Sequence, residues 1–109
     1  IVSALRSAVR YARERRGIRN QFARPISAQA REELERTCRT AFRALSLRDY
    51  ARCDVRLDAD DRVWLLEANA NPFIAEGHDF AEAAHKSGRE YPALIQRLAD
   101  LAQARTRRG

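Results

Sequence analysis

The chain is poor in several residue types, and each shortage narrows the range of functions. Its 109 residues include two cysteines, three prolines, four glycines and one tryptophan, and no methionine. The cysteines form no C-x-x-C or Cys/His pattern, which disfavours a zinc site. Cys38 and Cys53 each lie within an apolar pattern, so we expect free, buried thiols that behave as small hydrophobic residues.

Long apolar runs are also lacking. No segment is long enough to span a membrane and no signal-peptide pattern is present, so we expect a cytoplasmic protein without a membrane partner. Charge is abundant instead, with 21 Lys and Arg residues against 15 Asp and Glu and a net charge of +6. Every basic residue except Lys86 is an arginine. We interpret this excess as a solvated surface, with a polyanion-binding face as the alternative, because net charge informs about partners and not about fold.

Apolar residues recur at helical spacing in three segments, which predicts three helices. Asp79 as an N-cap and a break at Ser87-Gly88 predict a fourth, shorter helix before the last of these. These helices cover residues 2–16, 29–46, 79–85 and 92–105. Ser27 is a favourable N-cap for the second helix, and Pro92 suits the first turn of the last one. A break before Pro25 separates a basic N-terminal helix and linker, residues 1–24, from the main unit, residues 25–109.

Between the second and third helices, alternating residues predict a β-hairpin with strands at 49–57 and 62–69. One face of the first strand carries Tyr50, Arg52, Asp54 and Arg56, and the other carries Ala51, Cys53, Val55 and Leu57. On the second strand, the same alternation groups Val63, Leu65, Glu67 and Asn69. If Leu57 pairs with Trp64, Asp54 lies opposite Glu67. Trp64 and Leu66 then point to the covered face, beneath the second and fourth helices.

The pairing of Asp54 with Glu67 has a chemical consequence. Two carboxylates side by side repel and destabilise the empty sheet, whereas a divalent cation reverses that cost. Oxygen ligands at this spacing suit magnesium, although a solvated strand face with ordinary surface charges is the alternative. The acids of the turn, Asp58-Ala-Asp-Asp-Arg62, lack the glycine and the downstream glutamate of an EF-hand, so turn chemistry explains them better than calcium does.

The residues of this hairpin resemble the last part of an ATP-grasp ligase, closest to the D-alanine–D-alanine ligase group. That family carries an Arg-x-Asp strand, an acidic turn, and an apolar strand that ends in Leu-Leu-Glu, followed by an Asn and a Pro. The matching residues are Arg52, Asp54, Leu65-Leu66-Glu67, Asn69 and Pro72. The resemblance runs from roughly Phe22 to Ala102 and implies an α+β fold, an antiparallel hairpin flanked by helices, as a fragment of the ATP-grasp C-terminal domain.

The resemblance also implies roles for individual residues. Asp54, Glu67 and Asn69 resemble ligands of magnesium, with manganese as the alternative, that bridge the phosphates of ATP. Arg52 resembles the cation that steadies the acyl phosphate and the tetrahedral intermediate, and Leu66 would lie near the adenine. The implied partners are ATP, a small carboxylate and an amine. Because a complete ligase of this family is longer, we expect a fragment that needs an N-terminal part of the same protein and is inactive alone.

Two departures from the family pattern concern the loop after the second strand. Phe73-Ile74 stands where the family usually has Gly-Met, and Asp79-Phe80 replaces a Ser-Leu pair, which leaves the amine substrate open. His78 and His85 are interpreted as surface residues, with His78 as the better candidate for a site role. A homodimer, a basic nucleic-acid-binding module and a catalytically silent interaction domain remain alternatives, although no nucleic-acid-binding motif is present.

Overall fold

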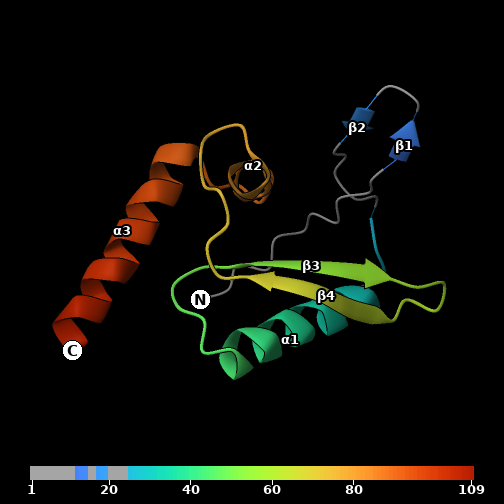
Figure 1. Cartoon of the computed structure of the whole chain (residues 1–109), viewed down its shortest axis with the longest axis horizontal. Coiled ribbons are helices and arrows are strands. Elements are labelled where there is room, and N and C mark those ends of the chain that lie inside the picture. The colour runs from blue at the N-terminus through green and yellow to red at the C-terminus, as the bar shows by residue number, and fades with distance from the viewer. Residues whose placement is uncertain (1–11, 15–16, 20–24) are drawn as a thin grey trace.

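The computed structural model describes residues 12–14, 17–19 and 25–109, and has an α+β architecture. Its strands are β1 (Ala12–Glu14), β2 (Gly17–Arg19), β3 (Arg52–Leu57) and β4 (Val63–Asn69). Its helices are α1 (Ala28–Ala44), α2 (Asp79–Lys86) and α3 (Tyr91–Arg108). Strand β1 pairs with β2, and β3 pairs with β4, both antiparallel. The predicted fold class, an antiparallel hairpin flanked by helices, is confirmed (Figure 1).

The prediction for the N-terminal part was wrong where it can be compared. Residues 12–14 form strand β1 and not the end of a helix, and Gly17 begins β2 instead of stopping that helix. The predicted helix had only a narrow apolar stripe, and most helical stability comes from packing such a stripe against a core. Residues 1–11, 15–16 and 20–24 lie outside the described residues.

Helix α1 begins as its sequence predicts. The Ser27 Oγ accepts a hydrogen bond from the Ala30 N–H at 3.1 Å, which satisfies one of the unpaired donors of the first turn. The same hydroxyl donates to Asp61 Oδ2 at 3.0 Å. Since Asp61 lies in the turn between β3 and β4, one serine both caps the helix and ties it to the hairpin.

The β3–β4 hairpin contains a bulge that alternation alone did not predict. Near the turn, Leu57 pairs with Val63 and Arg56 pairs with Trp64, so the predicted pairing of Leu57 with Trp64 was wrong. The register then shifts between Val55 and Asp54, which leaves one residue of β4, Leu66, without a partner. Beyond that point Asp54 pairs with Glu67, as predicted. A bulge inserts one residue into one strand and reverses the alternation of faces at that point.

The bulge changes which face the apolar residues of β4 occupy. Directly paired residues share a face, so Val63 and Leu65 lie with Leu57 and Val55 and not with Glu67. Trp64 lies on the face of Arg56 and is 56% exposed, so its predicted place in the core was wrong.

Helix α1 packs against the hairpin on the face that carries Cys53 (Figure 1). Cys38 of α1 meets Cys53 of β3, and both thiols are free and half-buried. Burial raises the pKa of the Cys38 thiol to about 12, with a smaller contribution from Cys53. The free thiols are thus as expected. Ala30 and Ala41 are the buried residues of α1. Their small side chains let the helix approach the hairpin closely.

Helix α3 packs on α2. The prediction that α3 covers the sheet was therefore wrong. The core here consists of Phe80, Ala81, Ala84 and Leu94, with Tyr50, Ile74, Tyr91 and Leu98 packed against it. Figure 1 shows α3 standing beside α2 and away from α1. An ion pair joins Arg105 near the end of α3 to Asp49, just before β3. The apolar stripe of α3 was recognised correctly, but its partner is a helix.

None of the helices in the described part of the chain has the length and apolar character needed to cross a membrane.

Candidate functional site

Arg52 and Asp54 form a two-point contact on one face of β3. The Arg52 Nε donates to Asp54 Oδ1 at 3.0 Å, and Nη2 donates to Oδ2 at 3.4 Å. Residues two apart on a strand share a face, so the strand itself sets this geometry. Both side chains are partly exposed, and the guanidinium has further N–H groups with which it can bind an anion.

Glu67 lies directly opposite Asp54 on the same face. Cβ atoms of such a pair are about 5 Å apart, so the two carboxylates are neighbours. The Glu67 side chain forms neither a hydrogen bond nor an ion pair with another residue in the described part of the chain. Among the described residues, Arg52 therefore balances the charge of Asp54, and no cation is paired with Glu67.

Asn69 ends strand β4 beside these residues. It pairs with Arg52 across the hairpin, and its Oδ1 accepts a hydrogen bond from the Asn71 N–H at 2.9 Å. This local turn leads the chain into Pro72, which is buried. A carbonyl oxygen has two lone pairs, so the Asn69 amide can bond the turn and still ligate a cation.

Leu66 is the unpaired residue of the bulge and is 67% exposed. The prediction that the helices cover it was therefore wrong, because the extra residue removes it from regular alternation. Leu66 instead offers an apolar side chain next to Glu67 that a ligand can contact.

The donors on this face fit a hard divalent cation. Two carboxylates and one amide oxygen are the ligand types that magnesium prefers, and magnesium usually completes its shell with water and substrate phosphates. No group of three His, Cys, Asp or Glu side chains suited to a metal occurs in the described part of the chain. Asp54, Glu67 and Asn69 are thus too few for a closed metal site, and a cation there would need further ligands such as phosphate oxygens.

The family model described as D-ala D-ala ligase C-terminus matches residues 6–100, which is most of the chain. The chain belongs to this family. It is 35% identical over 82 residues to the D-alanine–D-alanine ligase of Chromohalobacter salexigens, covering 73% of the chain and 26% of that relative. It is 32% identical over 91 residues to the D-alanine–D-alanine ligase of Desulfovibrio desulfuricans, covering 84% of the chain and 30% of that relative.

Another relative has no assigned activity. The uncharacterized protein y4sG of Sinorhizobium fredii is 39% identical over 64 residues, which is 59% of the chain and 19% of that protein. The chain thus spans about a quarter of the length of the curated relatives that it matches. The resemblance to the D-alanine–D-alanine ligase group and to the C-terminal part of its fold is confirmed.

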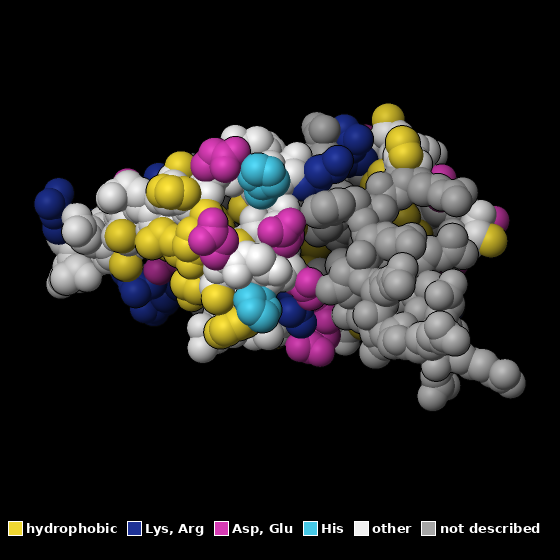
Figure 2. Space-filling view, turned by 90° about the horizontal axis from the view of Figure 1, so that it is seen from above, with side chains coloured by type: hydrophobic (Ala, Val, Ile, Leu, Met, Phe, Trp, Pro, Cys, Tyr) yellow, Lys and Arg dark blue, Asp and Glu magenta, His cyan; other side chains and the backbone are white. Residues whose placement is uncertain are grey.

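The loop between β4 and α2 lies next to the carboxylate pair in sequence and departs from the family pattern. Phe73 is 64% exposed, and its ring meets that of His78 edge-on at a centroid distance of 4.4 Å. His85 Nδ1 lies 3.4 Å from Glu90 Oε1. Figure 2 shows both histidine rings near carboxylates on the same face of the molecule, so this region is not uniformly basic. The expected capping of α2 by Asp79 was wrong, because His78 occupies the N-cap position.

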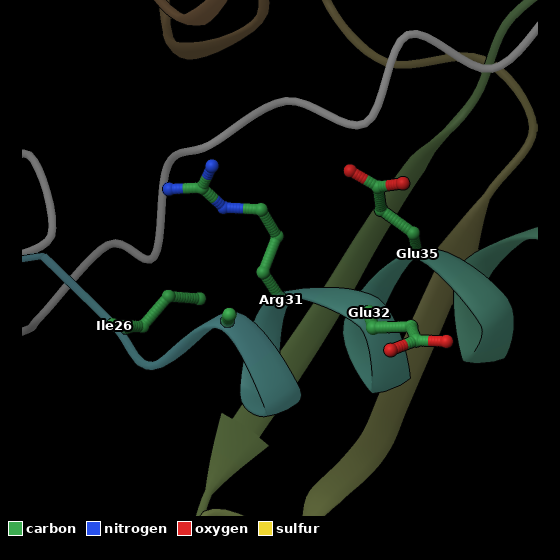
Figure 3. A pocket seen from close by; sticks show the side chains of 5 residues that line it. Ile26, Arg31, Glu32 and Glu35 are labelled. Carbon is green, nitrogen blue, oxygen red and sulfur yellow. The ribbon is translucent and has the colours of Figure 1, made fainter.

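A shallow hollow of about 340 Å³ lies at the beginning of α1. It is lined by Ile26, Ala28, Arg31, Glu32 and Glu35 (Figure 3). None of the predicted site residues lines it. In Figure 3, Arg31 and Glu35 extend from the same side of the helix, so the hollow contains both charge signs and does not select one kind of ion.

Sequence reasoning missed the contacts that organise the tip of the hairpin. Asp58 accepts hydrogen bonds from two backbone N–H groups of the turn and from the Trp64 indole. The sequence signal was an aspartate at the first position of an acidic turn, since Asp commonly bonds the backbone two residues on. The bond to Trp64 requires the bulged register and had no such signal.

Proposed function

We propose that this chain supplies the residues that bind magnesium and the ATP phosphates in an ATP-dependent carboxylate–amine ligase. The proposal rests mainly on the Asp54–Glu67 pair on one sheet face, with Arg52 hydrogen-bonded to Asp54. Membership of the D-alanine–D-alanine ligase C-terminal family supports the reaction class. Relatives named D-alanine–D-alanine ligase support it as well.

Each acidic or amide side chain has a task in this proposal. Asp54, Glu67 and the Oδ1 of Asn69 would hold magnesium, or manganese, at the end of the hairpin. When bound, the cation neutralises phosphate oxygens and supports in-line transfer of the γ-phosphoryl group to a carboxylate. The negative charges of Asp54 and Glu67 would repel a phosphate in the absence of the cation, so nucleotide and metal should bind together.

Arg52 provides the fixed positive charge for the second half of the reaction. An amine attacks the acyl phosphate, and negative charge develops on oxygen at the tetrahedral carbon. The guanidinium can bind two oxygens at once. Its bond to Asp54 orients it before substrate arrives, which reduces the reorganisation needed during the reaction.

Leu66 supplies the apolar contact in this scheme. Its exposed side chain next to Glu67 suits the adenine of a nucleotide whose phosphates reach the carboxylates. The substrates are a small carboxylate and an amine. The identity of the amine is left open, because Phe73 is bulky where a backbone approach to substrate would favour glycine.

The test uses the full-length protein and measures ATP-dependent ADP release with a panel of amino acids. Asp54→Asn and Glu67→Gln should each lower the rate about 100- to 1,000-fold, the usual effect of removing one electrostatic contact in an active site. Glu32→Gln on the exposed side of α1 is the matched control and should retain the parent rate. Full activity in either site variant, with the fold intact, contradicts the proposal.

The nucleic-acid alternative can be tested on the same preparation. A titration with single- and double-stranded oligonucleotides at several salt concentrations measures the number of phosphate contacts from the salt slope. A steep slope with no ATP-dependent activity would favour a nucleic-acid-binding module. The three arginines in the last turn of α3 need no such partner, because cations stabilise a helix C-terminus.

A further inference from the structure

The tip of the hairpin is organised around Asp58. Its Oδ1 accepts from the Asp60 N–H at 2.9 Å and from the Arg62 N–H at 3.0 Å, and its Oδ2 accepts from Trp64 Nε1 at 3.0 Å. Its backbone N–H donates to the Arg62 carbonyl at 3.1 Å. Asp58 and Arg62 therefore close the turn, with three residues between them.

The turn adopts a common three-residue geometry. The Asp61 N–H donates to the Asp58 carbonyl at 3.1 Å, and Asp61 has a φ of 60°. A type I turn followed by a left-handed residue is the usual form of a three-residue hairpin loop. This turn brings Leu57 opposite Val63, and so it determines the register at the tip.

The observed pairing of residues 63–66 can be compared with that of a regular hairpin. In a regular hairpin without a bulge, Asp54 would still pair with Glu67, but Leu57 would pair with Trp64. Trp64 would then face α1, where burial of its ring is favourable. In the observed register Trp64 is exposed on the opposite face. Another interaction must offset the burial that the Trp64 ring loses. The hydrogen bond from its indole to Asp58 at the hairpin tip is such an interaction.

Only the observed register lets the indole reach Asp58. Asp58 follows Asp54 and Arg56 at two-residue steps, so its side chain lies on their face, and Trp64 reaches that face by pairing with Arg56. In the regular register the indole would point away from Asp58. The turn, the bulge and the hydrogen bond are therefore consistent with one register alone.

We propose that Asp58 is a positioning residue that holds β4 in its bulged register through the hydrogen bond to Trp64. The bulge keeps the Trp64 ring on the same face as Asp54 and Glu67 and releases Leu66 from regular pairing. Bulges commonly lie next to active sites, where they redirect a side chain. The role in nucleotide binding rests on the function proposed above, whereas the register itself does not.

The register is tested by NMR on this chain, independently of activity. In the parent chain, cross-strand NOEs should join Arg56 to Trp64. Asp58→Asn keeps one oxygen, which should remain bonded to the two backbone N–H groups, so its amide nitrogen faces the indole and cannot accept that N–H. The NOEs from Arg56 should then be replaced by NOEs between Leu57 and Trp64, and the indole hydrogen should exchange faster. NOEs between Asp54 and Glu67 occur in both registers and report that the hairpin is still folded.

Trp64→Phe provides a second route to the same result, since it removes the donor and keeps an aromatic ring. It should shift the register as Asp58→Asn does, and the double variant should add nothing further. Persistence of the contacts between Arg56 and residue 64 in both single variants, with the hairpin folded, overturns the proposal.

The positioning role is tested in the full-length protein. Asp58→Asn should raise KM for ATP about tenfold while kcat changes less than about twofold, because ground-state and transition-state binding are lost equally. A shifted register with an unchanged KM overturns the positioning role and leaves the proposed function standing. Glu67→Gln tests the proposed function separately, since Glu67 keeps its partner in either register.

Discussion

Asp54 and Glu67 are neighbours on one sheet face but are not equivalent. Both oxygens of Asp54 accept hydrogen bonds from Arg52, while Glu67 has no such bond to another residue in the described part of the chain. Within the described residues, one carboxylate of the pair is thus compensated by an arginine and the other is not.

This asymmetry predicts different effects of two isosteric substitutions on the stability of the chain. Glu67→Gln removes the like-charge contact with Asp54 and should leave the free energy of unfolding unchanged or slightly higher. Asp54→Asn removes the same repulsion but also the partner of Arg52, a partly exposed ion pair worth less than about 1 kcal/mol. Thermal unfolding of the two variants and the parent checks whether Glu67→Gln is at least as stable as the parent. A lower unfolding midpoint for Glu67→Gln than for the parent would contradict the prediction.

Arg52→Lys should remove most of the ligase activity of the full-length protein. A lysine keeps the charge but cannot bond two oxygens in one plane, so its contact with Asp54 and with the acyl phosphate becomes a point contact. Arg97→Lys on α3 is the matched control and should have no effect on initial rates of ADP release. Equal rates for the two variants would exclude a two-point role for Arg52.

The chain alone should bind magnesium only weakly. Asp54, Glu67 and Asn69 provide few ligands, and magnesium gives up its water reluctantly unless phosphates contribute. Isothermal titration calorimetry of the chain with magnesium and no nucleotide should show no tight binding. Tight binding under these conditions would mean that the protein supplies a closed metal site and that phosphate is not required.

The indole signal of Trp64 should report the ionisation of Asp58. Hydrogen bonds from Trp64 and then from the Arg62 backbone lower the pKa of Asp58 below its usual 3.8. Because the folded pKa is the lower one, this contribution to stability is present above pH 3.8 and is lost as the pH falls through the folded value. The Nε1–H chemical shift should titrate with a midpoint below 3.8.

Two controls accompany that titration. Asp58→Asn should abolish the inflection in the indole shift, since the carboxylate that accepts the indole N–H is gone. Trp64→Phe, followed through the Asp58 carboxyl signal, should move the midpoint upward because the largest stabilising hydrogen bond is gone. An unmoved midpoint in Trp64→Phe would assign the lowered pKa to the turn backbone instead.

Phe80→Ala should detach the α2–α3 unit. Phe80 is 7% exposed and its ring lies 5.6 Å from that of Tyr50, so it joins the helices to the segment before β3. Loss of a buried phenylalanine typically costs about 3 to 5 kcal/mol of stability. Phe73→Ala, an exposed phenylalanine in the adjoining loop, should change stability by only about 0.5 kcal/mol. Chemical denaturation of the two variants measures the difference.

Local patterns in the sequence were sufficient for the hairpin strands and for the three helices after residue 25. Alternation placed Arg52 and Asp54 on one face, and the Ser27 cap marked the beginning of α1. These features depend on neighbours a few residues away, so they are encoded locally. The pairing of Asp54 with Glu67 was also predicted, although through a register that is wrong near the turn.

The tertiary structure decided the remaining features. The bulge at Leu66 depends on turn geometry and on the hydrogen bond that the Trp64 indole donates to Asp58, and periodicity contains no information about either. The partner of α3 was also undetermined, because an apolar stripe states that a helix is buried but not against what. The sequence by itself therefore determined which residues share the candidate site, and long-range packing determined which apolar side chains lie beside them.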